Sequence, residues 1–113
     1  MAALDGGVAA TATASGMAAL TTAVMTICSS GDHIVASSRM YGANINLLEN
    51  TLPRFDITTT FVAPDDVEAI AAAVQPNTKI IFGEVIGNPG LDVMDVAAVA
   101  AVGRDKHVPL MLD

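Results

Sequence analysis

The chain has 113 residues, a hydrophobic fraction of 52% and a formal net charge of −7 at pH 7. Its five Lys and Arg residues are scattered along the sequence, which excludes the clustered basic surface of a nucleic-acid-binding protein. Twenty of the hydrophobic residues are Ala and only four residues are aromatic, so we expect helices packed closely on a sheet around a thin core.

The first half of the sequence predicts two strands, each followed by a helix. The segment VAATATA (8–14) is typical of a strand, and the apolar residues after it recur with helical spacing. They are Met17, Leu20, Val24, Ile27 and Cys28. DHIVASS (32–38) predicts the second strand, and the next helix has an apolar face that ends near Pro53. That face contains Ile45, Leu48 and Leu52.

The next part of the chain continues this alternation. DITTTFVA (56–63) is rich in β-branched residues and predicts a third strand. Asp65 and Asp66 then place favourable negative charge at the start of a helix. Its apolar series is Val67, Ile70, Ala71 and Val74. TKIIFGEV (78–85) predicts the fourth strand.

The last part predicts a turn, a helix and a fifth strand. GNPG (87–90) is the turn, residues 95–106 form the helix with Val96, Val99 and Ala100 inward, and VPLML (108–112) is the strand. Strands that alternate with helices predict an α/β fold with a mostly parallel sheet flanked by helices. No internal boundary is visible, so residues 1–113 are expected to form a single α/β unit.

Ligands of such sheets bind at the carboxyl ends of the strands, beside helix N-termini. Ser15, Gly16 and Met17 follow the first predicted strand, and free N–H groups there would bind an anion. Alternatively, Ser15 only caps the helix. The glycine patterns of dinucleotide-binding and P-loop proteins are absent. No Lys or Arg lies nearby in the sequence to neutralise a phosphate.

Four more polar residues follow predicted strands. Tyr41 is the only tyrosine, and its ring either stacks on a flat ligand or is an ordinary half-buried aromatic. Glu84 ends a strand, and Asn88 precedes a proline, which holds Asn88 extended unless the segment is simply an Asn-Pro turn. Asp113 follows an apolar strand, where a buried carboxylate needs a partner.

The remaining histidines and lysines indicate no site. His33 and His107 have no Cys or carboxylate at metal-ligand spacing, so we interpret both as structural and expect no metal. Lys79 and Lys106 precede strands, at the end opposite the ligand edge, and are expected to be solvated.

The lone Cys28 lies on an apolar helix face and is expected in the core. A single cysteine excludes an internal disulfide and fits a cytoplasmic, reducing compartment. No signal peptide is visible at the first residues. The uncharged stretch from residue 6 to 31 is too rich in Thr, Ser and Gly for a membrane-spanning helix.

Taken in this order, several stretches resemble the Cys/Met-metabolism family of pyridoxal-phosphate enzymes of fold type I. They are SGMAAL, GDHIVASSRMYG, ENTLPRF, GEVIGNPGLDVMD and VPLMLD, and they cover nearly the whole chain. IGNPGLDVMD is most similar to the O-acetylhomoserine sulfhydrylase branch. Cystathionine γ-synthases and methionine γ-lyases more often show an ESPxNP form.

The resemblance implies roles for six residues. The amides of Gly16 and Met17 would bind the phosphate of pyridoxal 5'-phosphate, and Tyr41 would stack on its ring and assist proton movements. Asn88 would donate to the 3′-oxygen, with Glu84 in support. Asp113 would pair with the ring nitrogen, where a carboxylate favours the protonated form.

The family's Schiff-base lysine, in an S-x-[ST]-K motif, has no counterpart here. The family's phosphate-binding Tyr and Arg, supplied by a neighbouring subunit, precede the matched region. The resemblance therefore implies an internal fragment of a cofactor-binding domain, without the N-terminal segment and the lysine-bearing part, that is inactive in isolation.

The implied parent enzyme is a cytoplasmic homodimer or homotetramer with shared active sites. It would replace the γ-substituent of O-acetylhomoserine with sulfide or a thiol, forming homocysteine or methionine. Two alternatives stay open. One is a non-catalytic doubly wound binding or receiver domain, in which Asp113 would be a phosphoacceptor or a nucleotide-contacting carboxylate and Glu84 the one candidate for a further Mg²⁺ ligand. The other is a structural or interaction role for a truncated chain, with exposed apolar surface and self-association.

Overall fold

The computed structural model describes residues 1–113 and contains one four-stranded sheet. The strands are β1 (His33–Ser37), β2 (Thr58–Val62), β3 (Thr78–Gly83) and β4 (Leu110–Leu112). Their spatial order is β2-β1-β3-β4, and every neighbouring pair is parallel. The predicted α/β fold with a mostly parallel sheet is therefore confirmed.

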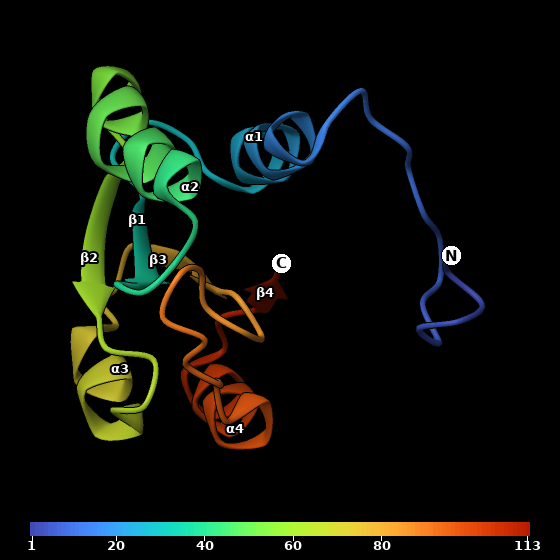
Figure 1. Ribbon diagram of the computed structural model, residues 1–113. Helices are drawn as coiled ribbons and strands as arrows, with labels where there is room; N and C mark the ends of the chain where they lie inside the picture. Colours follow the sequence, from blue (N-terminus) through green and yellow to red (C-terminus); the bar gives the residue numbers. More distant parts are fainter.

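Helices cover both faces of this sheet (Figure 1). On one face lie α1 (Gly16–Ile27) and a continuous helical segment. That segment consists of α2 (Gly42–Asn46), the π-helical turn η1 (Leu47–Thr51) and the 3₁₀ turn η2 (Leu52–Phe55). On the other face lie α3 (Val67–Ala73) and α4 (Val96–Lys106). None of the helices is both long and apolar enough to span a membrane.

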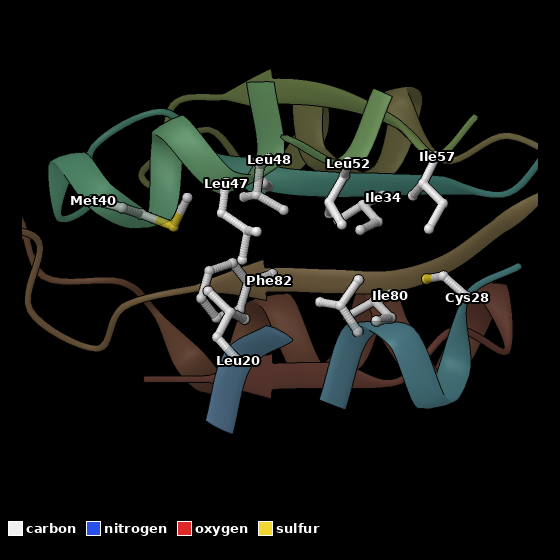
Figure 2. Packing of buried hydrophobic residues seen from close by; sticks show 12 residues of the cluster. Leu20, Cys28, Ile34, Met40, Leu47, Leu48, Leu52, Ile57, Ile80 and Phe82 are labelled. Carbon is white, nitrogen blue, oxygen red and sulfur yellow. The ribbon is translucent and has the colours of Figure 1, made fainter. Parts of the chain in front are cut away.

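The two central strands supply side chains to both cores, because successive residues of a strand point to opposite faces. Ile34 and Phe82 belong to the core under α1 and the 42–55 segment, whereas Val35 and Ile81 belong to the core under α3 and α4. Figure 2 shows Leu47, Leu48 and Leu52 directed from the helical segment toward Ile34 and Phe82. All five residues of β1 are buried, as expected of a strand covered on both sides.

Three helices begin at residues that cap them. The side chains of Ser15, Asp66 and Asp95 each accept a hydrogen bond from the amide three residues later, at 3.1, 2.8 and 3.0 Å. Each bond satisfies one of the free N–H groups of a first turn. The prediction that α3 opens at the aspartates is thus confirmed for Asp66. His107, with φ of 57°, ends α4 in the left-handed conformation.

The predicted strand at residues 8–14 is wrong. The segment has no strand or helix, its residues are exposed, and it extends away from the body of the molecule (Figure 1). Four of its seven residues are Ala, so pairing with the sheet would bury little apolar area to offset the cost of ordering the backbone. The sheet accordingly has four strands rather than five.

Two details of the helices also differ from the prediction. The helical segment does not stop at Pro53 but continues to Phe55, because proline is tolerated in the first turn of a 3₁₀ helix, where its missing N–H is not needed. Ile27, expected on the buried face of α1, is 45% exposed at the end of that helix. Cys28, one position on, is buried in the core as expected.

Candidate functional site

Four predicted site residues meet at the carboxyl edge of the sheet. Tyr41, Glu84, Asn88 and Asp113 line one open cleft of about 420 Å³, together with Ile86. They follow β1, β3 and β4, which are adjacent in the sheet. The parallel topology therefore brings together residues that are up to 72 positions apart in the sequence.

Glu84 is the centre of this group. Its carboxylate is buried, with only 7% of the residue exposed, and it accepts three hydrogen bonds. Oε1 accepts from the amide of Tyr41 at 2.7 Å and from the Nδ2 group of Asn44 at 3.0 Å, and Oε2 accepts from the amide of Asn88 at 3.1 Å. These bonds satisfy a buried charge without a cation and fix the backbone at Tyr41 and Asn88.

Asp113 is joined to the same network through Asn44. The Asn44 Nδ2 group donates to Oδ2 of Asp113 at 3.2 Å as well as to Glu84. The backbone of Asp113 is fixed too, since its amide donates to Gly83 at 3.0 Å and its carbonyl accepts from Val85 at 3.2 Å. Oδ1 of Asp113 accepts no hydrogen bond from the chain, so it is free to bind a ligand.

The N-terminus of α1 lies beside Asp113. Gly16 and Asp113 line a second cleft of about 170 Å³, whose other residues are mostly apolar. The amides of Gly16 and Met17 donate to no group of the chain, whereas the Ala18 amide is capped by Ser15. Ser15 is therefore a cap, and two further N–H groups remain available for an anion.

The Tyr41 side chain is about half exposed (51%) at the cleft, which leaves its ring accessible to a ligand. The residue also precedes α2, and its carbonyl accepts hydrogen bonds from the backbone amides of Asn44 and Ile45 at 2.9 and 3.2 Å. The position thus presents an aromatic ring from a firmly held backbone.

The loop that contains Asn88 is also fixed. The Asn88–Pro89 peptide bond is cis. The Gly87 amide donates to the carbonyl of Asp92 at 2.8 Å, and Arg39 forms an ion pair with Asp92 at 2.8 Å. A Cβ atom at Gly87 would lie 2.5 Å from the carbonyl oxygen of Arg39, so only glycine fits this close approach.

No cationic side chain lines either cleft. Lys79 lies near Asp32, at 3.9 Å, at the opposite end of the sheet, and Lys106 lies in the last turn of α4. Arg39 is engaged with Asp65 and Asp92. Within residues 1–113, the site therefore has two free amides at the start of α1 but no cationic side chain to neutralise a phosphate.

The other candidate polar residues have structural surroundings. His33 is buried between strands, with its ring nitrogens 2.8 and 2.9 Å from the hydroxyls of Thr78 and Thr60, and burial lowers its pKa. Burial, aided by the Asp32 carboxylate, raises the pKa of the Cys28 thiol, which makes this cysteine a poor nucleophile. No group of three or more His, Cys, Asp and Glu residues could hold a metal ion.

Sequence reasoning missed Asn44. This residue is 98% buried and contacts two of the site carboxylates. It lies four positions before Leu48 and eight before Leu52, both in the core. A polar amide on the apolar face of a helix was the signal, because a buried amide needs partners.

Comparison with known proteins identifies relatives of this chain. The chain is 50% identical over 114 aligned positions to the O-acetyl-L-homoserine sulfhydrylase of Corynebacterium glutamicum. It is 47% identical over 113 residues to the homocysteine synthase of Schizosaccharomyces pombe. Each match covers 100% of this chain but 26% of the relative, so the chain spans about a quarter of the length of these proteins.

Solved structures show the same fold. The cystathionine γ-lyase of Lactobacillus plantarum, complexed with L-serine, has a TM-score of 0.95 and 37% identity over 99% of this chain and 29% of its own. A Campylobacter jejuni structure that contains N′-pyridoxyl-lysine-5′-monophosphate has a TM-score of 0.86 and 31% identity, over 88% of this chain and 25% of its own.

The family model of the Cys/Met metabolism PLP-dependent enzymes matches residues 1–113. A match over the whole chain, with close relatives and a shared fold, decides against the receiver-domain alternative. The chain belongs to the Cys/Met metabolism family of pyridoxal-phosphate-dependent enzymes.

Proposed function

We propose that this chain supplies part of the cofactor site of an O-acetylhomoserine sulfhydrylase, which replaces the acetoxy group at the γ-carbon with sulfide or a thiol. The observation that carries the proposal is the meeting of Tyr41, Glu84, Asn88 and Asp113 in one cleft, beside the free α1 N-terminus. The products would be homocysteine with sulfide, or methionine with methanethiol.

The residues at the site fit pyridoxal phosphate by their chemistry. The free amides of Gly16 and Met17, aided by the dipole of α1, suit the phosphate. Oδ1 of Asp113 suits a protonated ring nitrogen, and the exposed ring of Tyr41 suits a stacked pyridine. The Asn88 side chain, held from its backbone by Glu84, would bind the 3′-oxygen.

When bound, the cofactor supplies an electron sink for a carbanion formed from the substrate. The protein's part is to keep the ring nitrogen protonated and the ring in place. Asp113 does the first by its negative charge, and Tyr41 and Asn88 do the second. Asp113 and Tyr41 are therefore the proposed catalytic residues of this chain, with Tyr41 also assisting proton movements.

The choice of branch rests on two relatives of high identity. The C. glutamicum and S. pombe proteins, at 50% and 47%, are named as a sulfhydrylase and a homocysteine synthase. The IGNPGLDVMD stretch supports the same branch. The alternatives are a cystathionine γ-synthase and a methionine γ-lyase, and the close structural match to a cystathionine γ-lyase keeps the lyase chemistry under test.

We further propose that residues 1–113 are one segment of a larger cofactor-binding domain. The relatives are about four times longer, and no Lys or Arg of this chain reaches the clefts. The Schiff-base lysine and the phosphate-neutralising Arg would come from residues outside this segment. We propose that a neighbouring subunit of a cytoplasmic homodimer or homotetramer supplies the Arg.

The test is to express the full-length protein that contains these residues and supply O-acetylhomoserine with sulfide. We expect homocysteine, visible absorbance from bound pyridoxal phosphate, and loss of activity in the Asp113→Asn variant. O-acetylhomoserine with cysteine in place of sulfide, which would yield cystathionine and acetate, tests the synthase alternative, and methionine without sulfide tests the lyase alternative. Release of an α-keto acid from methionine at a higher kcat/KM than homocysteine formation would reassign the branch. Absence of cofactor binding would refute the proposal altogether.

A further inference from the structure

Asn44 occupies an unusual place in the network. It lies in α2, 98% buried, and the two hydrogens of its Nδ2 group are divided between two carboxylates. One is directed to Glu84, at the end of β3, at 3.0 Å, and the other to Asp113, after β4, at 3.2 Å. One side chain thus connects the two acidic groups of the site.

Without this amide the two carboxylates would have no common donor. No Lys, Arg or His bonds to either, and negative groups this close repel each other. An amide carries no charge, so it bridges them without removing the negative potential that a protonated ring nitrogen needs. A Lys or Arg in its place would compete with that nitrogen for Asp113.

The bond also fixes how Asp113 is turned. The hydrogen bond holds Oδ2, so the carboxylate cannot rotate freely and Oδ1 remains the available oxygen. An Asp held by backbone bonds alone would still rotate about its side-chain bonds and would lose that freedom when a ligand binds.

We propose that Asn44 is a positioning residue, which orients Asp113 toward the ring nitrogen of pyridoxal phosphate and couples it to Glu84. This inference rests on the proposed function, because it needs the cofactor in the cleft. Asn44 would contact no cofactor atom and would act on the ring nitrogen only through Asp113.

The experiment compares Asn44→Leu with Asn46→Leu in the full-length protein. Leu has nearly the shape of Asn but no donor, and Asn46 is an exposed residue of the same helix. Each apo-protein is titrated with pyridoxal phosphate and with the carbocyclic analogue in which C–H replaces the ring nitrogen. We expect Asn44→Leu to weaken binding of pyridoxal phosphate about tenfold, which corresponds to ~1.4 kcal/mol. Binding of the analogue should weaken less than about twofold, because the analogue offers nothing for Asp113 to bind.

The outcomes separate the two proposals. If the wild type binds no pyridoxal phosphate, the proposed function fails. If the wild type binds it and Asn44→Leu weakens both ligands equally, or neither, Asn44 is a packing residue and this inference is overturned. Should Asn44→Leu fail to fold, Asn44→Thr replaces it. A hydroxyl has one hydrogen and serves one carboxylate at a time, so we expect about threefold weaker binding, again for pyridoxal phosphate alone. Equal effects on both ligands refute the inference in this variant too.

Discussion

Replacing Glu84 with Gln tests whether the buried carboxylate holds the site together. Gln has the same shape, so no cavity forms and only the charge and one acceptor change. One oxygen can still accept from the Tyr41 amide and from Asn44. The new NH₂ group, however, meets the Asn88 amide, which now bonds to Oε2 at 3.1 Å. Two donors then face each other.

The magnitude follows from the kinds of hydrogen bond involved. Bonds to a charged acceptor contribute about 1.5–3 kcal/mol each, and neutral ones about 0.5–1.5 kcal/mol. The substitution removes the hydrogen bond from the Asn88 amide and converts the other two from bonds to a charged acceptor into bonds to a neutral one. Part of this loss is offset, because a neutral amide is less costly to bury than a carboxylate. We expect the free energy of unfolding of Glu84→Gln to fall by about 3 kcal/mol, a large part of the total for a small domain.

The assay is urea denaturation of the chain followed by circular dichroism, with amide hydrogen exchange as a local readout. Exchange should accelerate more at Asn88 than at Tyr41, because only the Asn88 amide loses its acceptor. Glu49→Gln, at an exposed glutamate, is the control and should change stability by less than about 0.5 kcal/mol. If Glu84→Gln behaves like this control and Asn88 stays protected, the carboxylate is not what fixes the loop.

Three further predictions concern other parts of the molecule. Gly87→Ala should lower the free energy of unfolding by about 1–3 kcal/mol, because the new Cβ would meet the backbone of Arg39. The control is Gly42→Ala, which should not lower it, because nothing lies within 4 Å of a Cβ at that position. Equal urea midpoints of the two variants would contradict the close approach at Gly87. Burial lowers the pKa of His33, so the unfolded state binds a proton at this residue more readily than the folded state does. The stability contributed by the neutral, buried His33 is therefore complete above the ordinary pKa of 6.5 and is lost as the pH falls through the lowered pKa. As the pH falls below 6.5, the urea midpoint of the wild type should therefore fall more steeply than that of His33→Gln. Parallel pH profiles of the two proteins would refute the lowered pKa of His33. Arg39→Gln breaks ion pairs at 2.8 and 3.4 Å, but their side chains are partly exposed, so it should cost less than about 1 kcal/mol. The difference should shrink in high salt, and a cost that persists there would point to packing instead.

Much of the fold followed from local pattern. The strands at 32–38, 56–63 and 78–85 are long β-branched or apolar runs, and all three form. The segment at 8–14 also has a pattern typical of a strand, but four of its seven side chains are Ala, and it forms no strand. Periodicity reports which face a side chain would take, whereas buried area decides whether the strand pairs at all.

The site shows a similar division. The sequence allowed us to predict that four site residues share one edge of the sheet, because parallel strands bring their carboxyl ends together. They are Tyr41, Glu84, Asn88 and Asp113. The hydrogen bonds among them could not be predicted, since they depend on rotamers and on the depth of Asn44 beneath the cleft. The roles of these residues toward a cofactor remain predictions for the experiments above.

The link between Asn44 and Asp113 has a consequence for how the sheet is assembled. β4 pairs with β3 through only three residue pairs, and none of its three residues is fully buried. A shift of β4 by one residue would turn every one of its side chains to the opposite face, including Leu110 and Met111, which pack against the two cores. It would also move Asp113 by about 3.3 Å and out of reach of Asn44. The hydrogen bond between Asn44 and Asp113 therefore forms only when the edge strand is correctly aligned, so an error in strand pairing would also disturb the proposed cofactor site.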